Sequence, residues 1–194
     1  MAGTQTKKRN VYDFDKTVFA VDSTALFTWY CLKKYPRILP AILRTAVAFV
    51  LYGVKLQTKM YAKGMLYRFL GELPDTAAAV QDFWAAHGDK IQPWYLERKE
   101  PTDIIISASP EFLLRPMADK LGVALIASAV DPDCGAIQSE NCWGEEKVRR
   151  LQAEYPGTII GKFYSDSLSD SPLALLAEEA FLVKGTQLLP WPMQ

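Results

Sequence analysis

The feature that most constrains the fold is the separation between the first two stretches that read as β-strands. An apolar stretch that ends in Asp13 opens the sequence, and the next β-branched run begins only at Thr102. Helix-like stretches fill the interval, whereas strands and helices alternate after Thr102. Because such alternation forms an open parallel sheet, the sequence predicts an α/β fold: a Rossmann-like open parallel sheet with a helical cap inserted after the first strand.

The expected elements follow from apolar periodicity, from Pro and Gly positions and from helix-capping residues. We expect a core formed by residues 1–21 and 97–194 and a helical cap formed by residues 22–96. The expected strands are 8–14, 102–107, 123–130, 158–165 and 180–184. The expected helices are 22–34, 40–53, 56–70, 74–88, 93–99, 111–121, 144–155 and 172–179, with a loop at 166–170.

Two aspartates separated by one residue end the first expected strand. Alternate side chains of an extended strand point to the same side, so Asp13 and Asp15 project together from its end. Two carboxylates this close repel each other unless a cation holds both ionised, and a hard divalent cation is the natural candidate. Pairs of this kind also occur on solvated turns, so the meaning of this pair depends on what the rest of the chain supplies.

Polar residues follow other expected strands in the same way. Ligands of open α/β sheets bind beyond the carboxyl ends of the strands, so these residues can converge on one crevice. They are Ser107 and Ala108 after the second strand, Lys147 at a helix start, and Asp166 and Asp170 after the fourth strand. Singly, each has a plainer interpretation: Ser107 as a capping hydroxyl, Lys147 as an exposed lysine and Asp170 as a helix N-cap.

Taken in order, the stretch 13–17 followed by Ser107, Lys147 and the Asp166–Asp170 pair resembles the four motifs of the haloacid dehalogenase superfamily. It is similar in particular to the branch that contains phosphoserine phosphatase, in which a helical cap follows the first motif. The dehalogenases of the superfamily lack the second aspartate. The resemblance therefore implies phosphoryl chemistry, which depends mostly on positioning and charge neutralisation.

The resemblance also implies catalytic roles for the first motif. Asp13 would attack phosphorus and form an aspartyl-phosphate, and Asp15 would act as general acid and then as general base. Mg²⁺ would be bound by Asp13, by the backbone carbonyl of Asp15 and by Asp166. Thr17 would support this loop.

The remaining motifs would bind the phosphate. Ser107 and the backbone N–H of Ala108 would donate to phosphate oxygens, and Lys147 would offset the charge of phosphate and nucleophile together. Asp170 would hold a metal-bound water or orient Lys147. Four departures from the branch's usual pattern bear on recognition of a free amino-acid phosphate rather than on this core chemistry: Lys16, Ala108, Ser165 and Ser169.

Charge is distributed unevenly along the chain. The formal net charge is zero, so bulk charge predicts no nucleic-acid partner. Residues 23–71, however, contain eight Lys or Arg and no Asp or Glu, and residues 38–56 are strongly apolar. The uninterrupted apolar run 46–52 is far below the ~20 residues of a membrane span, so we do not expect a membrane-spanning helix here. One interpretation of the stretch is an ordinary cap helix packed on its neighbours. The other is a basic, apolar cap that contacts an anionic membrane surface peripherally or admits a lipid phosphate.

A finer resemblance concerns the substrate. The stretches 144–148 and 163–167, together with the basic apolar cap, are similar to bacterial C-type phosphatidylglycerophosphate phosphatases. This likeness implies a lipid phosphate as substrate. The alternatives are a phosphorylated small metabolite as substrate, a phosphomutase, and a non-catalytic phosphate-binding protein on the same scaffold. The last would be expected to have lost Asp13 or Asp15.

Other phosphate chemistries do not match the sequence. The stretch 157–162 lacks the spacing and the final Ser or Thr of a P-loop, and none of the three cysteines precedes an arginine as in cysteine-based phosphatases. Cysteine spacing fits no zinc site, and we expect His87, the single histidine, to be structural. Asp13 and Asp15 interrupt the first apolar stretch too early for a secretory signal, so we expect a cytoplasmic protein, with the inner membrane face as an alternative.

Overall fold

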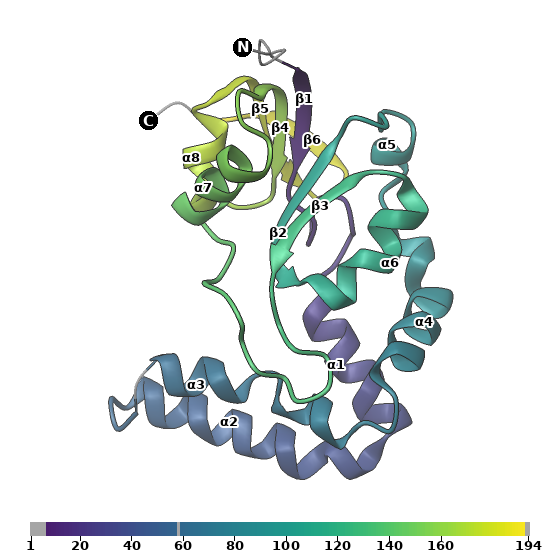
Figure 1. The fold of residues 1–194 in the computed structure, drawn as a ribbon, viewed down its shortest axis with the longest axis vertical. Coiled ribbons are helices and arrows are strands. Elements are labelled where there is room, and N and C mark those ends of the chain that lie inside the picture. Colours follow the sequence, from purple (N-terminus) through teal and green to yellow (C-terminus); the bar gives the residue numbers. More distant parts are fainter. Residues whose placement is uncertain (1–6, 58, 193–194) are drawn as a thin grey trace, which may run out of the picture.

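Six strands form one sheet at the centre of the molecule (Figure 1). The structure, a computed structural model, describes residues 7–57 and 59–192. The strand order is β3-β2-β1-β4-β5-β6, and every neighbouring pair is parallel except β5 and β6. The strands are β1 (Lys8–Tyr12), β2 (Ile104–Pro110), β3 (Ala124–Ser128), β4 (Ile159–Ser165), β5 (Ala177–Lys184) and β6 (Gln187–Pro190). The predicted α/β class with an open, Rossmann-like parallel sheet is confirmed.

The C-terminal end of the sheet differs from the prediction. The helix expected at 172–179 is only one turn, α8 (Ser171–Ala174), and β5 already begins at Ala177. Backbone pairing of Ala177 and Glu179 with β4 outweighs the helix propensity of their Ala- and Glu-rich sequence. The antiparallel strand β6 was not predicted, because its partner and the turn at Gly185 are set by the neighbouring β5.

The helices that follow β2 agree better with the sequence. The helix expected at 111–121 is found with these limits as α6 (Glu111–Leu121), and α7 (Glu145–Glu154) lies within the expected 144–155. The expected loop 166–170 contains a short 3₁₀ helix, η4 (Leu168–Asp170).

Helices between β1 and β2 form the part of the chain that we call the cap. Asp22 and Asp75 cap α1 and α4 as their side chains accept hydrogen bonds from the backbone N–H groups of Ala25 and Ala78. The elements are α1 (Ser23–Lys34), η1 (Pro36–Ile38), α2 (Leu39–Gly53), α3 (Lys59–Met65), η2 (Arg68–Glu72), α4 (Thr76–His87), η3 (Gly88–Lys90) and α5 (Pro93–Leu96). The prediction of a single helix at 56–70 is therefore wrong. The stretch is divided into α3 and η2, because the chain turns at Tyr67 to bury Phe69 and Leu70.

The hydrophobic core covers both faces of the sheet. Successive residues of one strand serve opposite faces: Val11 packs with the α7 and α8 side, whereas Tyr12 packs with the α1, α4 and α6 side. On the latter face the rings of Tyr12, Tyr164 and Phe181 stack across three strands, with centroids 4.8 and 5.0 Å apart. Burial on both faces explains why these strands read as continuous apolar runs.

The cap also contributes to this core. The ring of Tyr95 from α5 lies 4.9 Å from that of Tyr12, in an edge-to-face contact. Because α5, which falls within the expected cap, packs against the sheet, the division into a core of 1–21 and 97–194 and a cap of 22–96 stays a proposal. By contrast, α2 and α3 lie side by side and project from the body as an arm (Figure 1). The Thr45 hydroxyl joins the two helices by donating to the Met65 carbonyl at 2.7 Å.

Candidate active site

The predicted site residues meet at the carboxyl ends of the three central strands β2, β1 and β4. Asp13 directly follows β1, and its backbone N–H donates to the Tyr164 carbonyl of β4 at 2.8 Å. A small pocket of about 170 Å³ opens here. Its lining residues are Asp13, Asp15, Lys16, Asp22, Ser107, Ala108, Trp143, Lys147, Asp166, Ser167, Ser169 and Asp170. The pocket lies where ligands bind in open α/β sheets.

Lys147 connects two of these carboxylates. Its Nζ lies 2.7 Å from Asp13 Oδ1 and 2.7 Å from Asp170 Oδ2, and the lysine is only 2% exposed. The Ser165 hydroxyl donates to the same Asp170 oxygen at 2.7 Å. Gly144 makes this placement feasible because it starts α7 from a backbone with φ 59° and ψ −128°, which a side chain would strain. Lys147 is therefore a buried cation held by the site, not an exposed helix lysine.

The electrostatics of this pair favour a further positive charge. Burial raises the pKa of Asp13 to about 7, although Lys147 opposes the effect. Burial also acts to lower the pKa of Lys147, but Asp13 and Asp170 outweigh it and hold that pKa above its ordinary value. Lys147 is consequently a stable cation, whereas Asp13 needs additional charge neutralisation to be fully ionised at neutral pH.

Asp15 has a different environment from Asp13. The backbone N–H of Ser23 donates to its Oδ1 at 2.6 Å, and the Ser109 hydroxyl donates to its Oδ2 at 2.5 Å. Burial raises the pKa of Asp15, and these two hydrogen bonds act against that rise. A fixed carboxyl with a raised pKa suits a group that first gives and then takes a proton.

The phosphate-binding candidates lie at the end of β2. Ser107 is buried, and its Oγ accepts a hydrogen bond from the Ser109 backbone N–H at 3.1 Å. Ala108 is only half-buried and lines the pocket. The end of β2, which extends to Pro110 and not only to the predicted residue 107, therefore brings Ser107 and Ala108 into the same pocket as Asp13, as oxygen binding requires.

Asp166 and Asp170 lie on the far side of the pocket, after β4. Burial raises the pKa of Asp166, and the nearby Lys16 opposes the rise. Asp170 is buried, and its Oδ1 has no hydrogen-bond partner within the described part of the chain. A buried carboxylate oxygen without a partner is costly, so this atom indicates a place for a further ligand or water.

Thr17 is the predicted residue that does not line the pocket. It is fully buried, and its Oγ1 has no hydrogen-bond partner among residues 7–57 and 59–192. The loop around it is packed inward, since Val18 and Phe19 are also fully buried. Thr17 therefore packs within the loop that carries Asp15, and Thr17 itself does not reach the pocket. His87 lies elsewhere, with its ring against Tyr30 and Phe83.

Several pocket residues were not recognised as site residues in the sequence. Ser109 holds the carboxyl group of Asp15 by a hydrogen bond. Asp22 and Trp143 line the pocket, and Lys16 adds a positive charge near Asp166. Lys16 adopts φ 55°, the left-handed region that favours glycine. The proximity of Ser109 to Ser107 was a usable signal. The positions of Asp22 and Trp143 depend on helix and loop packing, which no local pattern reveals.

The site can accommodate Mg²⁺. Among the described residues, no three His, Cys, Asp or Glu side chains form a metal-binding cluster by themselves. Mg²⁺ does not require one, because it keeps several waters and binds through one or two carboxylates together with substrate phosphate. The raised pKa of Asp13 and the unpartnered Asp170 Oδ1 both fit a hydrated cation in this pocket.

Comparisons with known proteins agree with the fold. Protein CicA of Caulobacter vibrioides is 25% identical over 185 residues, covering 87% of this chain and 82% of the relative. A protein of unknown function from Bordetella pertussis Tohama I has a TM-score of 0.74 at 20% identity, covering 92% of this chain and 90% of that one. A phosphoserine phosphohydrolase-like protein from Francisella tularensis has a TM-score of 0.55 at 16% identity, covering 90% and 86%. These structural likenesses show the fold.

A central strand followed by two aspartates, beside a buried lysine–carboxylate network, suits phosphoryl chemistry, which depends on positioning and charge neutralisation. Residues 11–175 match the family model for haloacid dehalogenase-like hydrolases. The chain belongs to this family, and the predicted family and enzyme class are confirmed.

Proposed function

We propose that the protein is a Mg²⁺-dependent phosphatase that hydrolyses a phosphate monoester through an aspartyl-phosphate on Asp13. The observation that carries this proposal is the position of Asp13 in a pocket that also contains Lys147, Ser107 and Asp15. One pocket thus holds a nucleophile, a cation, an oxygen-binding strand end and an acid.

The chain's own residues divide the reaction between them. Asp13 attacks phosphorus while Lys147, the Ser107 hydroxyl and the Ala108 N–H bind the phosphate oxygens. Asp15 gives its proton to the leaving oxygen and then takes one from the water that hydrolyses the aspartyl-phosphate. Ser109 and Ser23 hold the Asp15 carboxyl in place during both steps.

Magnesium would be bound by Asp13, by the backbone carbonyl of Asp15 and by Asp166, with Asp170 near a bound water. When bound, it neutralises the charge of the phosphate and of Asp13. The residues of this chain then orient the phosphate, and Asp15 donates and accepts the proton.

Substitution of the nucleophile tests the reaction. Asp13→Asn should lower Mg²⁺-dependent phosphate release by at least ~1,000-fold while the far-ultraviolet circular dichroism stays unchanged. Asp119→Asn, on the exposed face of α6, is the matched control and should keep full activity. Phosphate release that persists in Asp13→Asn would exclude the aspartyl-phosphate route. A phosphomutase would instead return an isomeric phosphate ester, and a binding protein would return no product.

For the substrate, we propose a lipid phosphate such as phosphatidylglycerophosphate, encountered at a membrane surface. The supporting observation is the exposed apolar face of α2. Its outer stripe recurs at helical spacing and consists of Leu39, Leu43, Val47, Val50 and Val54, which are 44–65% exposed. The opposite, packed face carries small residues instead, Ala41, Thr45 and Ala48. The helix therefore turns a stripe of aliphatic side chains outward.

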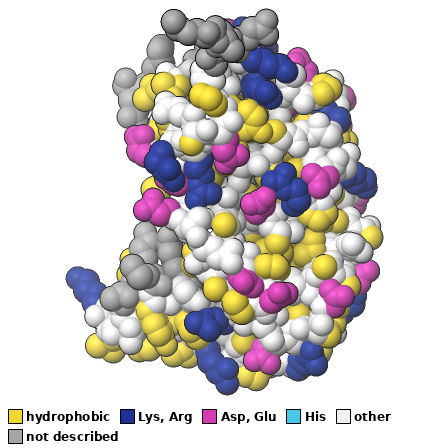
Figure 2. Space-filling model, viewed as in Figure 1, with side chains coloured by type: hydrophobic (Ala, Val, Ile, Leu, Met, Phe, Trp, Pro, Cys, Tyr) yellow, Lys and Arg dark blue, Asp and Glu magenta, His cyan; other side chains and the backbone are white. Residues whose placement is uncertain are grey.

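Charge favours an anionic membrane as the occupant of this stripe. Arg37, Arg44 and Lys55 are exposed on or beside α2, and residues 23–71 contain no acidic side chain. Figure 2 shows hydrophobic side chains on the arm with Lys and Arg side chains close by. Exposed apolar patches mark interaction sites, and basic residues beside them favour anionic lipids.

The stretch Pro36–Gly53 is long and apolar enough to cross a membrane by length and composition, which the interrupted apolar run did not predict. Its contacts favour surface binding over insertion across the bilayer. Ala41 belongs to the main hydrophobic cluster, and Thr45 hydrogen-bonds α3. A spanning orientation would break both contacts.

Vesicle binding tests this part of the proposal. The wild type should sediment with phosphatidylglycerol vesicles and much less with phosphatidylcholine vesicles. The triple variant Leu43→Ser, Val47→Ser, Val50→Ser should bind at least about tenfold more weakly, because each exposed aliphatic side chain contributes about 1 kcal/mol or more on burial. Leu175→Ser with Leu176→Ser, exposed outside the cap, is the control. A wild type that ignores both vesicles, with high activity on soluble phosphates, would favour a small-metabolite phosphatase.

A further inference from the structure

A larger cavity adjoins the catalytic pocket. It has a volume of about 760 Å³, within the range of small-molecule sites. Ala108 lines both the catalytic pocket and this cavity, so the two adjoin at the phosphate-binding end of β2. The other walls come from the end of α3 and the start of η2 on one side, and from the long loop between β3 and α7 on the other.

Hydrogen bonds connect the wall of the cavity to the proposed general acid. Asp15, the proposed acid, is hydrogen-bonded to Ser109, whose Oγ lies 3.0 Å from Thr24 Oγ1. The side chains of Thr24 and Tyr67 are themselves hydrogen-bonded, and Tyr67 lines the cavity. A continuous set of contacts thus joins the proton donor to the cavity wall.

The loop between β3 and α7 closes the cavity by direct contact with the cap. It extends from the sheet to the neighbourhood of α3 (Figure 1). Gly135, with φ 71°, approaches so closely that an added Cβ would lie 1.9 Å from the Tyr67 carbonyl oxygen. No other residue type fits this approach. The wall of the cavity is therefore assembled across the cap–core junction.

The two serine hydroxyl groups of the wall already have hydrogen-bond partners. The Ser128 hydroxyl binds Asn141 and the Cys142 backbone N–H, at 3.2 and 3.0 Å. The Ser139 hydroxyl binds the Ala129 N–H and Arg150, both at 3.0 Å. The other polar side chains of the wall, Arg68, Gln138 and Glu140, are exposed to solvent. The apolar contacts available to a ligand come from Leu66, Tyr67, Val130, Ala136 and Ile137.

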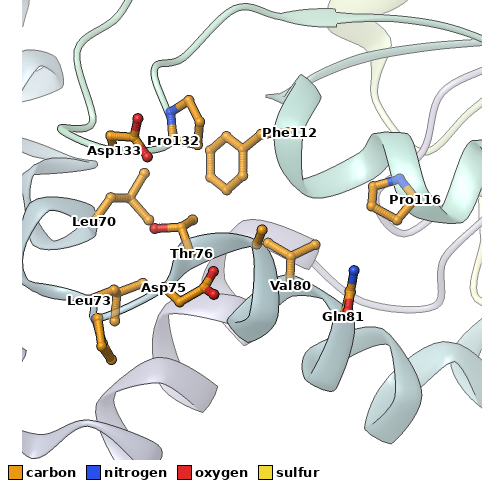
Figure 3. Close-up of a pocket in the computed structure, with 12 residues that line it drawn as sticks. Leu70, Leu73, Asp75, Thr76, Val80, Gln81, Phe112, Pro116, Pro132 and Asp133 are labelled. Carbon is orange, nitrogen blue, oxygen red and sulfur yellow. The ribbon is translucent and has the colours of Figure 1, made fainter.

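A separate cavity of about 560 Å³ is a poorer candidate for this role. It lies between α4, η2 and α6, with Leu70, Phe112 and Pro132 around it (Figure 3). None of the predicted site residues lines it. A group bound there would not be connected to the reacting phosphorus.

From these contacts we propose that the 760 Å³ cavity binds an apolar leaving group, the aliphatic part of a phosphate monoester. This inference rests on the proposed phosphatase function for the direction of the substrate. Ile137, Leu66 and Val130 then determine which substrate chain lengths are accepted. The choice between substrates is made at the cap–core junction, not at the exposed α2 stripe.

Binding of n-alkylphosphonates, which cannot be hydrolysed, tests the proposal in the full-length protein with Mg²⁺ present. Calorimetry should show affinity rising by up to about fourfold for each methylene that becomes buried. Octylphosphonate should bind at least about 30-fold more tightly than ethylphosphonate, which shares its charged group. Equal affinity for the two would overturn the proposal, whatever the catalytic activity.

Matched isoleucine variants locate the effect. Ile137 and Ile159 are 42% and 43% exposed, but only Ile137 lines the cavity. Ile137→Trp should fill the space and reduce octylphosphonate affinity at least tenfold, with ethylphosphonate affinity within twofold. Ile159→Trp should change neither. An unchanged chain-length preference in Ile137→Trp would place the apolar site elsewhere and overturn the assignment.

Hydrolysis of ethyl and octyl phosphate separates this inference from the proposed function. Their leaving groups have similar intrinsic reactivity, so a difference in kcat/KM reports binding. Turnover of both esters at equal kcat/KM would support the phosphatase and reject the cavity assignment. Tight octylphosphonate binding without turnover of either ester would support the cavity and reject the phosphatase.

Discussion

The sheet-centred core and the α2–α3 arm distribute polarity in opposite ways. In the core, Asp13, Lys147 and Asp170 are buried, and the lysine is paired with both carboxylates. On the arm, Val47 and Val50 are 56% and 65% exposed. Stability alone accounts for neither arrangement, because charged groups are costly to bury and apolar groups gain nothing when exposed. The core arrangement fits chemistry performed within the molecule, and the arm arrangement fits contact with something outside it.

The buried cation gives the sharpest test of the core half of this comparison. Lys147→Met should lower the free energy of unfolding by about 3–5 kcal/mol, because it leaves two buried carboxylates without their partner. Urea unfolding at neutral pH measures the effect. Adding Asp170→Asn should recover part of the loss, since it removes one of the unpaired charges.

An exposed lysine provides the matched control. Lys162→Met breaks only a 4.0 Å pair with Glu179, in which both side chains are about half exposed, and should cost less than about 1 kcal/mol. Equal losses in Lys147→Met and Lys162→Met would show that the buried network contributes nothing specific to stability.

Apolar truncations compare the two regions directly. Ile105→Ala, at a fully buried position of β2, should cost about 2–5 kcal/mol through lost burial and a residual cavity. Val47→Ala, on the exposed α2 stripe, should stay within about 0.5 kcal/mol, since little area is lost and alanine is the better helix former. Thermal unfolding of the two variants checks this. A large loss for Val47→Ala in the absence of lipid would mean that the stripe is packed in solution, and would break the comparison.

The smallest expected effect concerns the hydroxyl that holds Asp15. The Ser109 hydrogen bond lowers the pKa of Asp15, so Ser109→Ala should raise that pKa further. The protonated acid then persists to higher pH, so the limb of the pH–rate profile that depends on protonated Asp15 should move to higher pH. At neutral pH the rate should fall about tenfold, because the Asp15 carboxyl loses a hydrogen bond that fixes its position.

The pH profile distinguishes positioning from general structural damage. Ser171→Ala, which removes an exposed hydroxyl bonded to the Leu168 carbonyl, should leave the profile unchanged. A lower rate in Ser109→Ala without any shift along the pH axis would mean that Ser109 acts only through packing.

Local patterns in the sequence predicted much of the fold. Periodicity and residues at helix starts located α1, α4 and α6, because Asp22, Asp75 and Pro110 act within one turn of the helices that they begin. The same reasoning failed where a distant partner decides the conformation. Residues 177–179 pair with β4 instead of extending α8, and the helix expected at 56–70 breaks at Tyr67 against Gly135.

The candidate site divides in the same way. The order of Asp13, Ser107, Lys147 and Asp166 along the chain was enough to predict that they share one pocket, because parallel strands bring their carboxyl ends to one edge. The hydrogen bond from Ser109 to Asp15 could not be predicted, since it joins residues 94 positions apart through side-chain geometry.

The sequence by itself determined the kind of chemistry, because that depends on which functional groups follow which strands. The tertiary structure alone decided how these groups are paired and what lies beyond them. Burial makes Lys147 a shared cation of two carboxylates, the contact of Gly135 with Tyr67 closes a cavity beside Ala108, and packing on small residues turns the apolar stripe of α2 outward. Each of these depends on segments far apart in the chain meeting in space, which no local pattern of residues encodes.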